Sequence, residues 1–155
     1  MATQTLPITG TLVLQSFGLH PSSAPNTPAI LLPLGDDPIG RITFTPDSYM
    51  SCTLTSREAA SPIASPSWIL ANDEEVLHAA RSLVTYCGPF KLYHEDGQTL
   101  LSTQVEIALD PTWIGKPQVR KWELRDDVML VLRPLQNILL PVGCVCVCVM
   151  GFGVW

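Results

Sequence analysis

Charged residues are scarce in this chain. They make up 15% of its 155 residues, against about 25% in an average soluble domain. The chain has 9 Lys and Arg residues against 14 Asp and Glu residues, a net charge of −5, and no cluster of basic residues. A protein that binds the phosphate backbone needs a concentrated basic surface, so nucleic-acid binding is not expected.

The chain also lacks the motifs that mark several kinds of active site. It contains neither a glycine-rich phosphate loop nor a Gly-x-Ser-x-Gly nucleophile motif. His20, His78 and His94 lie far apart and do not have the spacing of metal ligands. A phosphate loop, a serine nucleophile and a histidine metal site are therefore not expected, and no cofactor is predicted.

The first residues, MATQTLPITGTLVLQ, lack the basic segment and the apolar run of a signal peptide. A cytoplasmic location without membrane association is the resulting expectation. The five cysteines are odd in number and lack the spacing of a disulfide framework, so a secreted disulfide scaffold is not expected. Cys52 and Cys87 are interpreted as small buried hydrophobic residues.

What the chain has in quantity is apolar residues, at 46% of the total. A chain of this length can bury about 70% of its unfolded surface, which favours one core-rich domain. That domain is predicted over residues 1–141. Residues 142–155 form an atypical tail rich in Val and Cys.

Short β-prone segments alternate with turn motifs along most of the chain. Pro-Asp-Ser, Glu-Asp-Gly-Gln and Arg-Asp-Asp each separate two apolar segments, as expected of β-hairpins. The pattern predicts an all-β fold, a compact antiparallel β-barrel with one short α-helix. The predicted strands are residues 10–17, 41–45, 49–55, 90–94, 100–109, 119–124 and 128–132.

The helix is predicted at about residues 72–84. Asn72 can cap its first turn, and Glu75 stands where a capping box needs an acidic residue. Apolar residues recur at helical spacing from Val76 to Val84 and predict one apolar face.

Three segments together resemble a known family. They are IGRITFTPDSYMSCTL (39–54), LVTYCGPFKL (83–92) and TQVEIALDPTWIGKPQVRKWEL (103–124). Their order is similar to that of the lipocalin-like domain family of bacteria and fungi. Members of that family typically carry a Thr-Pro-Asp-Gly-Tyr-Met-Ser hairpin, a Tyr-x-Gly-x-Tyr strand, a Val-Glu strand, a Pro-x-Trp-x-Gly corner and a Gln-x-Arg strand.

The resemblance implies a lipocalin-like barrel around a hydrophobic pocket. In fungi, such proteins often accompany natural-product biosynthesis genes, and some barrels of this type act as isomerases or cyclases without a cofactor. The chain departs from the family pattern most at its ending, where the Val- and Cys-rich tail stands in place of a closing Trp-x-Arg-type strand, and it also departs at two positions. Ser48 replaces a turn glycine, and Gln104 stands where a histidine commonly precedes the Val-Glu pair.

Strand alternation selects the candidate site residues. Glu106 shares one face of the predicted strand 100–109 with Gln104, and Arg120 shares one face of the next strand with Gln118 and Trp122. If both faces point inward, Glu106 and Arg120 form a buried pair, because a buried charge without a partner is costly. The pair is either structural or catalytic, with Arg120 holding an anionic oxygen while Glu106 orients it or moves a proton.

Aromatic residues complete the candidate pocket. Tyr49 and Tyr86 either donate hydrogen bonds to a ligand or fill the core. Trp113 in the Pro-Trp-Gly corner either plugs the barrel or stacks on a ligand, and Trp122 has the same two interpretations. The predicted ligand-binding set is therefore Tyr49, Tyr86, Trp113, Gln118 and Trp122, beside the catalytic candidates Glu106 and Arg120.

Two functions fit these residues. The first is a cofactor-independent isomerase or cyclase that acts on a hydrophobic intermediate of fungal secondary metabolism. The second is a non-catalytic carrier of a hydrophobic small molecule. Both require an apolar cavity, so the composition does not separate them.

The tail has four interpretations. The first is a tail anchor, since residues 138–155 carry no charge, and the second is a metal site of alternating cysteines. The third is an unusual closing strand. The fourth is the product of an intron that was read through near Val142. A GT repeat translates as alternating Val and Cys, which favours read-through. In that case the closing strand is missing and a barrel edge is exposed.

Overall fold

The computed structural model describes residues 8–141 and 145–153. The side chains of residues 138 and 145–148 are outside this description. Within it the chain is mostly β, with one α-helix and two short 3-10 helices. The predicted all-β architecture is therefore confirmed.

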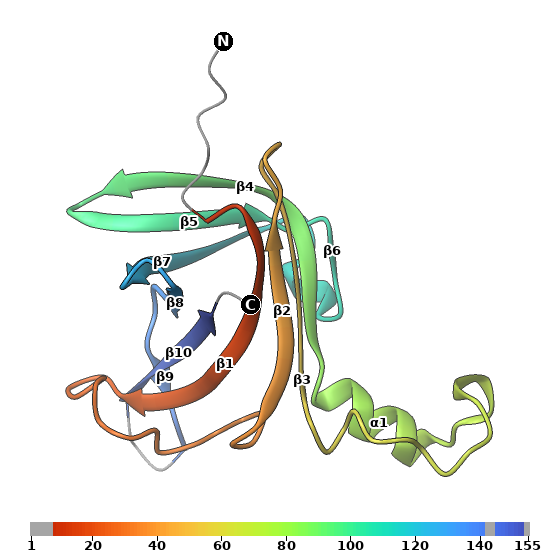
Figure 1. The fold of residues 1–155 in the computed structure, drawn as a ribbon. Helices are drawn as coiled ribbons and strands as arrows, with labels where there is room; N and C mark the ends of the chain where they lie inside the picture. The colour runs from red at the N-terminus through yellow and green to blue at the C-terminus, as the bar shows by residue number, and fades with distance from the viewer. Residues whose placement is uncertain (1–7, 142–144, 154–155) are drawn as a thin grey trace.

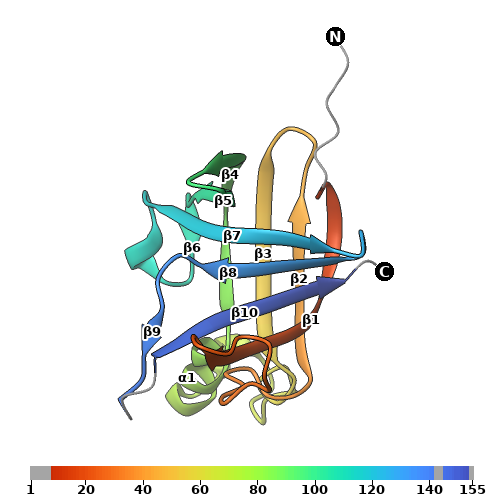
Figure 2. The same ribbon diagram turned by 90° about the vertical axis from the view of Figure 1, so that its left-hand side faces the viewer.

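The strands form one antiparallel sheet that closes into a ring (Figures 1 and 2). Neighbours follow the order β1-β2-β3-β4-β5-β7-β8-β10, and β10 pairs back onto β1. Two short strands lie off the ring, β6 against β4 and β9 against β10. The strand bounds are β1 Gly10–Pro21, β2 Pro38–Phe44, β3 Tyr49–Ser56, β4 Val84–Glu95, β5 Gln98–Gln104, β6 Ile107–Ala108, β7 Pro117–Arg125, β8 Met129–Pro134, β9 Ile138–Leu139 and β10 Val145–Gly153.

The predicted hairpins form where the turn residues suggested. Ser48, which replaces the family's turn glycine, adopts φ 65°, a left-handed conformation that favours glycine. The turn is still made, because the Ser48 amide donates to the Thr45 carbonyl at 3.1 Å. In the β4–β5 turn, Asp96 and Gly97 both have positive φ, as a two-residue hairpin turn requires.

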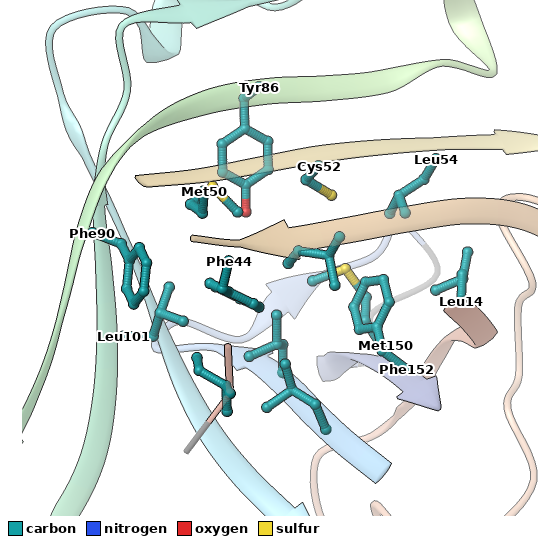
Figure 3. Packing of buried hydrophobic residues seen from close by; sticks show 14 of the residues in the cluster. Leu14, Phe44, Met50, Cys52, Leu54, Tyr86, Phe90, Leu101, Met150 and Phe152 are labelled. Atoms are coloured by element: carbon teal, nitrogen blue, oxygen red, sulfur yellow. The ribbon is translucent and has the colours of Figure 1, made fainter. Parts of the chain in front are cut away.

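Alternate residues of the strands fill the interior of the ring (Figure 3). In β3, for example, Met50, Cys52 and Leu54 are at most 2% exposed, whereas the residues between them face outward. The rings of Phe44 and Phe90 meet edge to face at 5.0 Å between centroids. The core is therefore the apolar interior of a closed sheet, as the composition predicted.

The helix α1 (Asp73–Arg81) begins as predicted and ends early. The Asn72 side chain accepts from the Glu75 amide, and the Glu75 carboxylate accepts from the Asn72 amide, so the capping box is confirmed. No residue of α1 is buried, and the helix projects away from the ring in Figure 1. The predicted extension to residue 84 is wrong, because Val84 already belongs to β4.

The predicted strand 100–109 is also interrupted. β5 ends at Gln104, and the chain crosses close over Gly88 of β4 before β6 begins at Ile107. The Glu106 amide donates to the Cys87 carbonyl at 2.9 Å, which fixes this crossing. Gln104 and Glu106 do share one face, but both are exposed, whereas Thr103 and Val105 are buried. The predicted inward orientation of the Gln104–Glu106 face is therefore wrong.

A closing strand is present. β10 pairs with β1 along Leu14↔Phe152 and with β8 along Leu132↔Met150, so neither neighbour is left with an open edge there. This geometry fits the closing-strand interpretation of the tail. The origin of residues 142–155 from a read-through intron stays a prediction, which transcript sequencing tests.

Two observations bear on the tail-anchor and metal-site interpretations of the tail. No helix within the described residues is long and apolar enough to cross a membrane. Among the described residues, no group of three His, Cys, Asp or Glu side chains could hold a metal ion. Cys144 and the side chains of Cys146 and Cys148 lie outside the description, so the predicted tail metal site is not addressed.

Candidate functional site

A pocket of about 190 Å³ lies inside the ring at the end where β3 finishes and β4 begins. Antiparallel pairing brings these strand ends to the same end of the sheet, together with the start of β7 and the end of β8. The pocket is lined by side chains from six strands and from the 3-10 helix η2 (Pro111–Trp113): Phe17, Cys52, Leu54, Val84, Tyr86, Trp113, Arg120, Pro134 and Met150.

The lining is mainly apolar, with a buried floor and a partly exposed rim. Cys52, Leu54, Tyr86 and Met150 are buried, and Figure 3 shows these four side chains directed into the same interior. The other lining residues are half-buried. The polar groups among the lining side chains are the Arg120 guanidinium, the Tyr86 hydroxyl and the Cys52 thiol.

Arg120 is the only charged residue of this pocket. Its Nη1 donates to the Val119 carbonyl at 3.2 Å and its Nη2 to Gln118 Oε1 at 3.3 Å. Its Nε is buried and has no hydrogen-bond partner. No carboxylate among the described residues forms an ion pair with Arg120. The guanidinium therefore enters the pocket without a counter-ion.

Tyr86 presents a neutral hydroxyl to the same pocket. Desolvation raises the pKa of Tyr86 well above its ordinary value, and the nearby Arg120 charge only partly opposes this. Its hydroxyl forms no hydrogen bond with any described residue. The Tyr86 ring meets the Trp113 indole edge to face at 5.6 Å between centroids, which holds both aromatic groups in place.

Cys52 lies on the pocket floor as a protonated thiol. Burial raises its pKa to about 12, with the Arg120 charge acting in the opposite direction. A thiol with this pKa is a poor nucleophile near neutral pH. The interpretation of Cys52 as a small buried hydrophobic residue is therefore confirmed. Cys87 is only half-buried and lies on the outer face.

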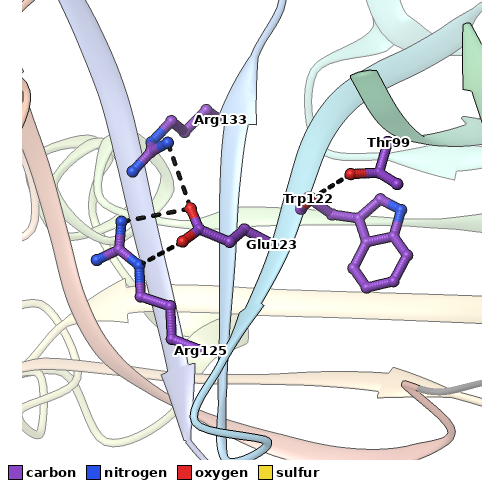
Figure 4. A network of polar contacts seen from close by, with 5 residues as sticks. All are labelled: Thr99, Trp122, Glu123, Arg125 and Arg133. Carbon is purple, nitrogen blue, oxygen red and sulfur yellow. Dashed lines mark hydrogen bonds and ion pairs between the residues drawn. The ribbon is translucent and has the colours of Figure 1, made fainter. Parts of the chain in front are cut away.

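The β7 candidates Gln118 and Trp122 share the inward face with Arg120. Gln118 is bonded to Arg120, and Trp122 packs against the core with its Nε1 buried and unpartnered. Figure 4 shows the Trp122 indole on the opposite side of β7 from the Glu123 carboxylate, which binds two surface arginines. The predicted alternation along β7 is confirmed, although neither Gln118 nor Trp122 lines the 190 Å³ pocket.

Tyr49 and Glu106 lie elsewhere. The Tyr49 hydroxyl donates to Glu106 Oε2 at 2.8 Å and contacts Cys87 Sγ at 3.4 Å, on the outer face of β3 and β4. These two bonds raise the pKa of Tyr49, the Cys87 contact first. The predicted Glu106–Arg120 pair inside the barrel is wrong. Arg120 pairs in register with the buried Leu101, so the inward face of β5 carries Leu101 and Thr103. Glu106 lies on the outer face, where Tyr49 is its partner.

Sequence reasoning missed six lining residues: Phe17, Cys52, Leu54, Val84, Pro134 and Met150. The alternation of β3 could have placed Cys52 and Leu54 inside, since it is regular over Met50–Leu54. No local signal marks Phe17 or Met150, because their position depends on how the two ends of the chain pair to close the ring.

The comparison with known families decides the identity of this fold. A family model for the lipocalin-like domain matches residues 13–140. The chain belongs to the lipocalin-like domain family. A search of the curated proteins finds no match.

Membership in the lipocalin-like family agrees with the closed sheet and with its internal apolar pocket. It is consistent with the binding of a small hydrophobic molecule. The family match contains every pocket residue except Met150, which β10 supplies from beyond residue 140. The pocket is therefore built by the lipocalin-like domain together with its closing strand.

Proposed function

We propose that this protein binds a small hydrophobic molecule that carries an anionic oxygen, held by Arg120 in the apolar pocket. The observation that carries the proposal is the buried, unpartnered Nε of Arg120 in a pocket that offers it no carboxylate. A buried N–H group of a charged side chain that lacks a hydrogen-bond partner is costly. An oxygen anion on the ligand would offset part of that cost through charge-assisted hydrogen bonds.

Tyr86 supports the same ligand chemistry. Its raised pKa keeps the phenol protonated at neutral pH, so the hydroxyl is a hydrogen-bond donor to a ligand oxygen. Arg120 and Tyr86 are both polar groups in an otherwise apolar lining. Few polar groups in an apolar cavity are typical of sites that orient small molecules.

The volume limits the size of the ligand. An apolar cavity of about 150 Å³ holds benzene, and this pocket has about 190 Å³. The proposed ligand portion is therefore one ring or a short branched chain with a carboxylate, a phenolate or an enolate oxygen.

Binding of benzoate, measured by calorimetry or by NMR shifts, tests the proposal. Wild-type protein is expected to bind benzoate more tightly than the neutral benzamide. Arg120→Met is expected to lose about 10- to 100-fold of the benzoate affinity, as befits a hydrogen bond to a charged group of about 1.5–3 kcal/mol. A variant that binds benzoate as tightly as the wild type would refute the role of Arg120. Tyr49→Phe, on the outer face, is the matched control and should leave affinity unchanged.

A second candidate is a cofactor-independent isomerase or cyclase that acts on a hydrophobic secondary-metabolite intermediate of a fungus, such as a polyketide or a terpenoid. The favouring observation is that two donors, Arg120 and Tyr86, share one mainly apolar pocket, where they could stabilise an enolate. The lining residues include no carboxylate and no imidazole to remove a proton, which is why binding stands first.

The catalytic candidate has its own measurement. An enolisable one-ring ketone incubated in D₂O should exchange its α-protons faster with wild-type protein than with Tyr86→Phe or Arg120→Met. Equal exchange in all three samples and in buffer, despite measurable binding, would exclude catalysis and leave the carrier function.

A further inference from the structure

A second cavity lies beside the ligand pocket. It has about 220 Å³ and is lined by Leu83, Val84, Thr85, Leu109, Asp110 and Trp113. Two of these residues, Val84 and Trp113, also line the ligand pocket. The two spaces therefore adjoin at the Trp113 indole and the Val84 isopropyl group, which together are called the wall. The second space is partly open to solvent, since Leu109 is 43% exposed and Asp110 is exposed.

We infer that the second cavity is a neighbouring compartment of the ligand site, and that Trp113 limits how far a ligand extends toward it by separating the two spaces. This inference rests on the proposed function for the identity of the ligand. The position of Trp113 and Val84 at the boundary of the two spaces does not depend on the proposed function, because both residues line both spaces. The pocket as it stands admits one ring, and removal of the wall would admit a second ring in line with the first.

Trp113 is held as a fixed wall. The 3-10 helix that carries it is capped by Asp110, whose Oδ1 accepts from the Thr112 amide at 2.9 Å and from the Thr112 hydroxyl at 2.7 Å. The Trp113 amide donates to the Asp110 carbonyl at 3.2 Å, and the Tyr86 ring packs against the indole. Anchored on both sides, the indole excludes a long ligand sterically.

The chemistry of the second compartment narrows the ligand class further. Leu83 and Leu109 are apolar, and Thr85 adds a hydroxyl. Asp110 is the charged group there, and its hydrogen bonds from Thr112 lower its pKa, so it is anionic at neutral pH. An extended ligand would therefore place its anionic oxygen at Arg120 and a neutral or cationic group near Asp110, because a second anion would be repelled.

Two wall variants and four probes test the inference. The variants are Trp113→Ala and Val84→Ala, which open the wall from its two sides. Ile114→Ala is the matched control, because it is the next residue after Trp113, is 47% exposed and lines neither space. The probes are benzoate and 2-naphthoate, which are anionic, and phenol and 2-naphthol, which are neutral at pH 7. Dissociation constants are measured by NMR for variants whose circular dichroism matches the wild type.

We expect the wild type and Ile114→Ala to bind the one-ring probes and to reject the two-ring probes. Either wall variant should bind the two-ring probes roughly tenfold or more tightly than the wild type does, since the added ring buries more apolar surface. If Trp113→Ala does not fold, Val84→Ala carries the test.

Three results overturn the inference: folded wall variants that gain no affinity for either two-ring probe, a wild type that binds two-ring probes as tightly as one-ring probes, or a protein that binds none of the four. Failure of the proposed function looks different. Phenol would then bind as tightly as benzoate and 2-naphthol as tightly as 2-naphthoate, while the size dependence persists.

Discussion

Gly88 is the position where a single added methyl group should do most damage to this fold. A Cβ on Gly88 would lie 1.9 Å from the Gln104 carbonyl oxygen and 2.9 Å from its carbon. Both are backbone atoms, so no side chain can rotate away. The Gly88→Ala substitution must push the 104–106 crossing off β4.

The expected cost is built from two contributions. Overpacking costs about 1–3 kcal/mol. The Glu106–Cys87 and Leu109–Thr85 backbone hydrogen bonds contribute about 1 kcal/mol each. Alanine lowers the conformational entropy of the unfolded chain relative to glycine, which offsets roughly 0.4–1 kcal/mol of this loss of stability. The net loss is about 3 kcal/mol, which lowers the melting temperature of a chain of this size by roughly 10 °C.

Urea unfolding followed by tryptophan fluorescence measures this loss. Gly151→Ala in β10 is the control, because its Cβ would meet only side-chain atoms, with Ser16 Oγ nearest at 3.0 Å. We expect the control to change the free energy of unfolding by less than about 1 kcal/mol. Equal unfolding midpoints for Gly88→Ala and the wild type would refute the close approach of the two backbone segments.

Three further predictions concern individual groups. Burial raises the pKa of Cys52 to about 12, so Cys52 should resist iodoacetamide at pH 8 in the native protein and react in urea. Mass spectrometry maps the labelled cysteines, and labelling of Cys52 in the native protein would contradict its burial. Asn72→Ala should speed hydrogen exchange in α1 without lowering the global melting temperature, since no residue of α1 is buried. In the wild type, bonds from Ser65 and Asn72 lower the pKa of the Glu75 carboxyl. The protection of the α1 amides from exchange should therefore be lost as pH falls through that pKa. Tyr49→Phe should lower the urea midpoint only slightly through the lost Glu106 bond, and a large loss of benzoate affinity would return Tyr49 to the ligand site.

Local patterns predicted the parts of this fold that local forces determine. The capping box of Asn72 and Glu75, the Asp96-Gly97 turn and the inward face of β7 all depend on neighbours within a few residues. Arg120 was placed in the pocket for the same reason, because strand alternation holds along β7.

The position of Glu106 could not be predicted in this way. Strand alternation puts Gln104 and Glu106 on one face, but it does not say whether that face points inward or outward. The register of β5 against β7, with Leu101 opposite Arg120 and Thr103 opposite Gln118, decides which face points inward. It puts Gln104 and Glu106 on the outer face, where Tyr49 binds Glu106. The pocket residues Phe17 and Met150 likewise depend on ring closure, a pairing that no local pattern predicts.

The pairing of β1 with β10 also determines when the two edges of β1 become paired during synthesis of the chain. β1 can pair with β2 as soon as both have left the ribosome, but its second edge has no partner until residues 145–153 have been synthesised. Contacts of such large sequence separation form slowly. Until they form, β1 and β8 present bare edges that other chains can join. Soluble yield should therefore depend on synthesis rate and on chaperone supply more than the stability of the finished ring suggests.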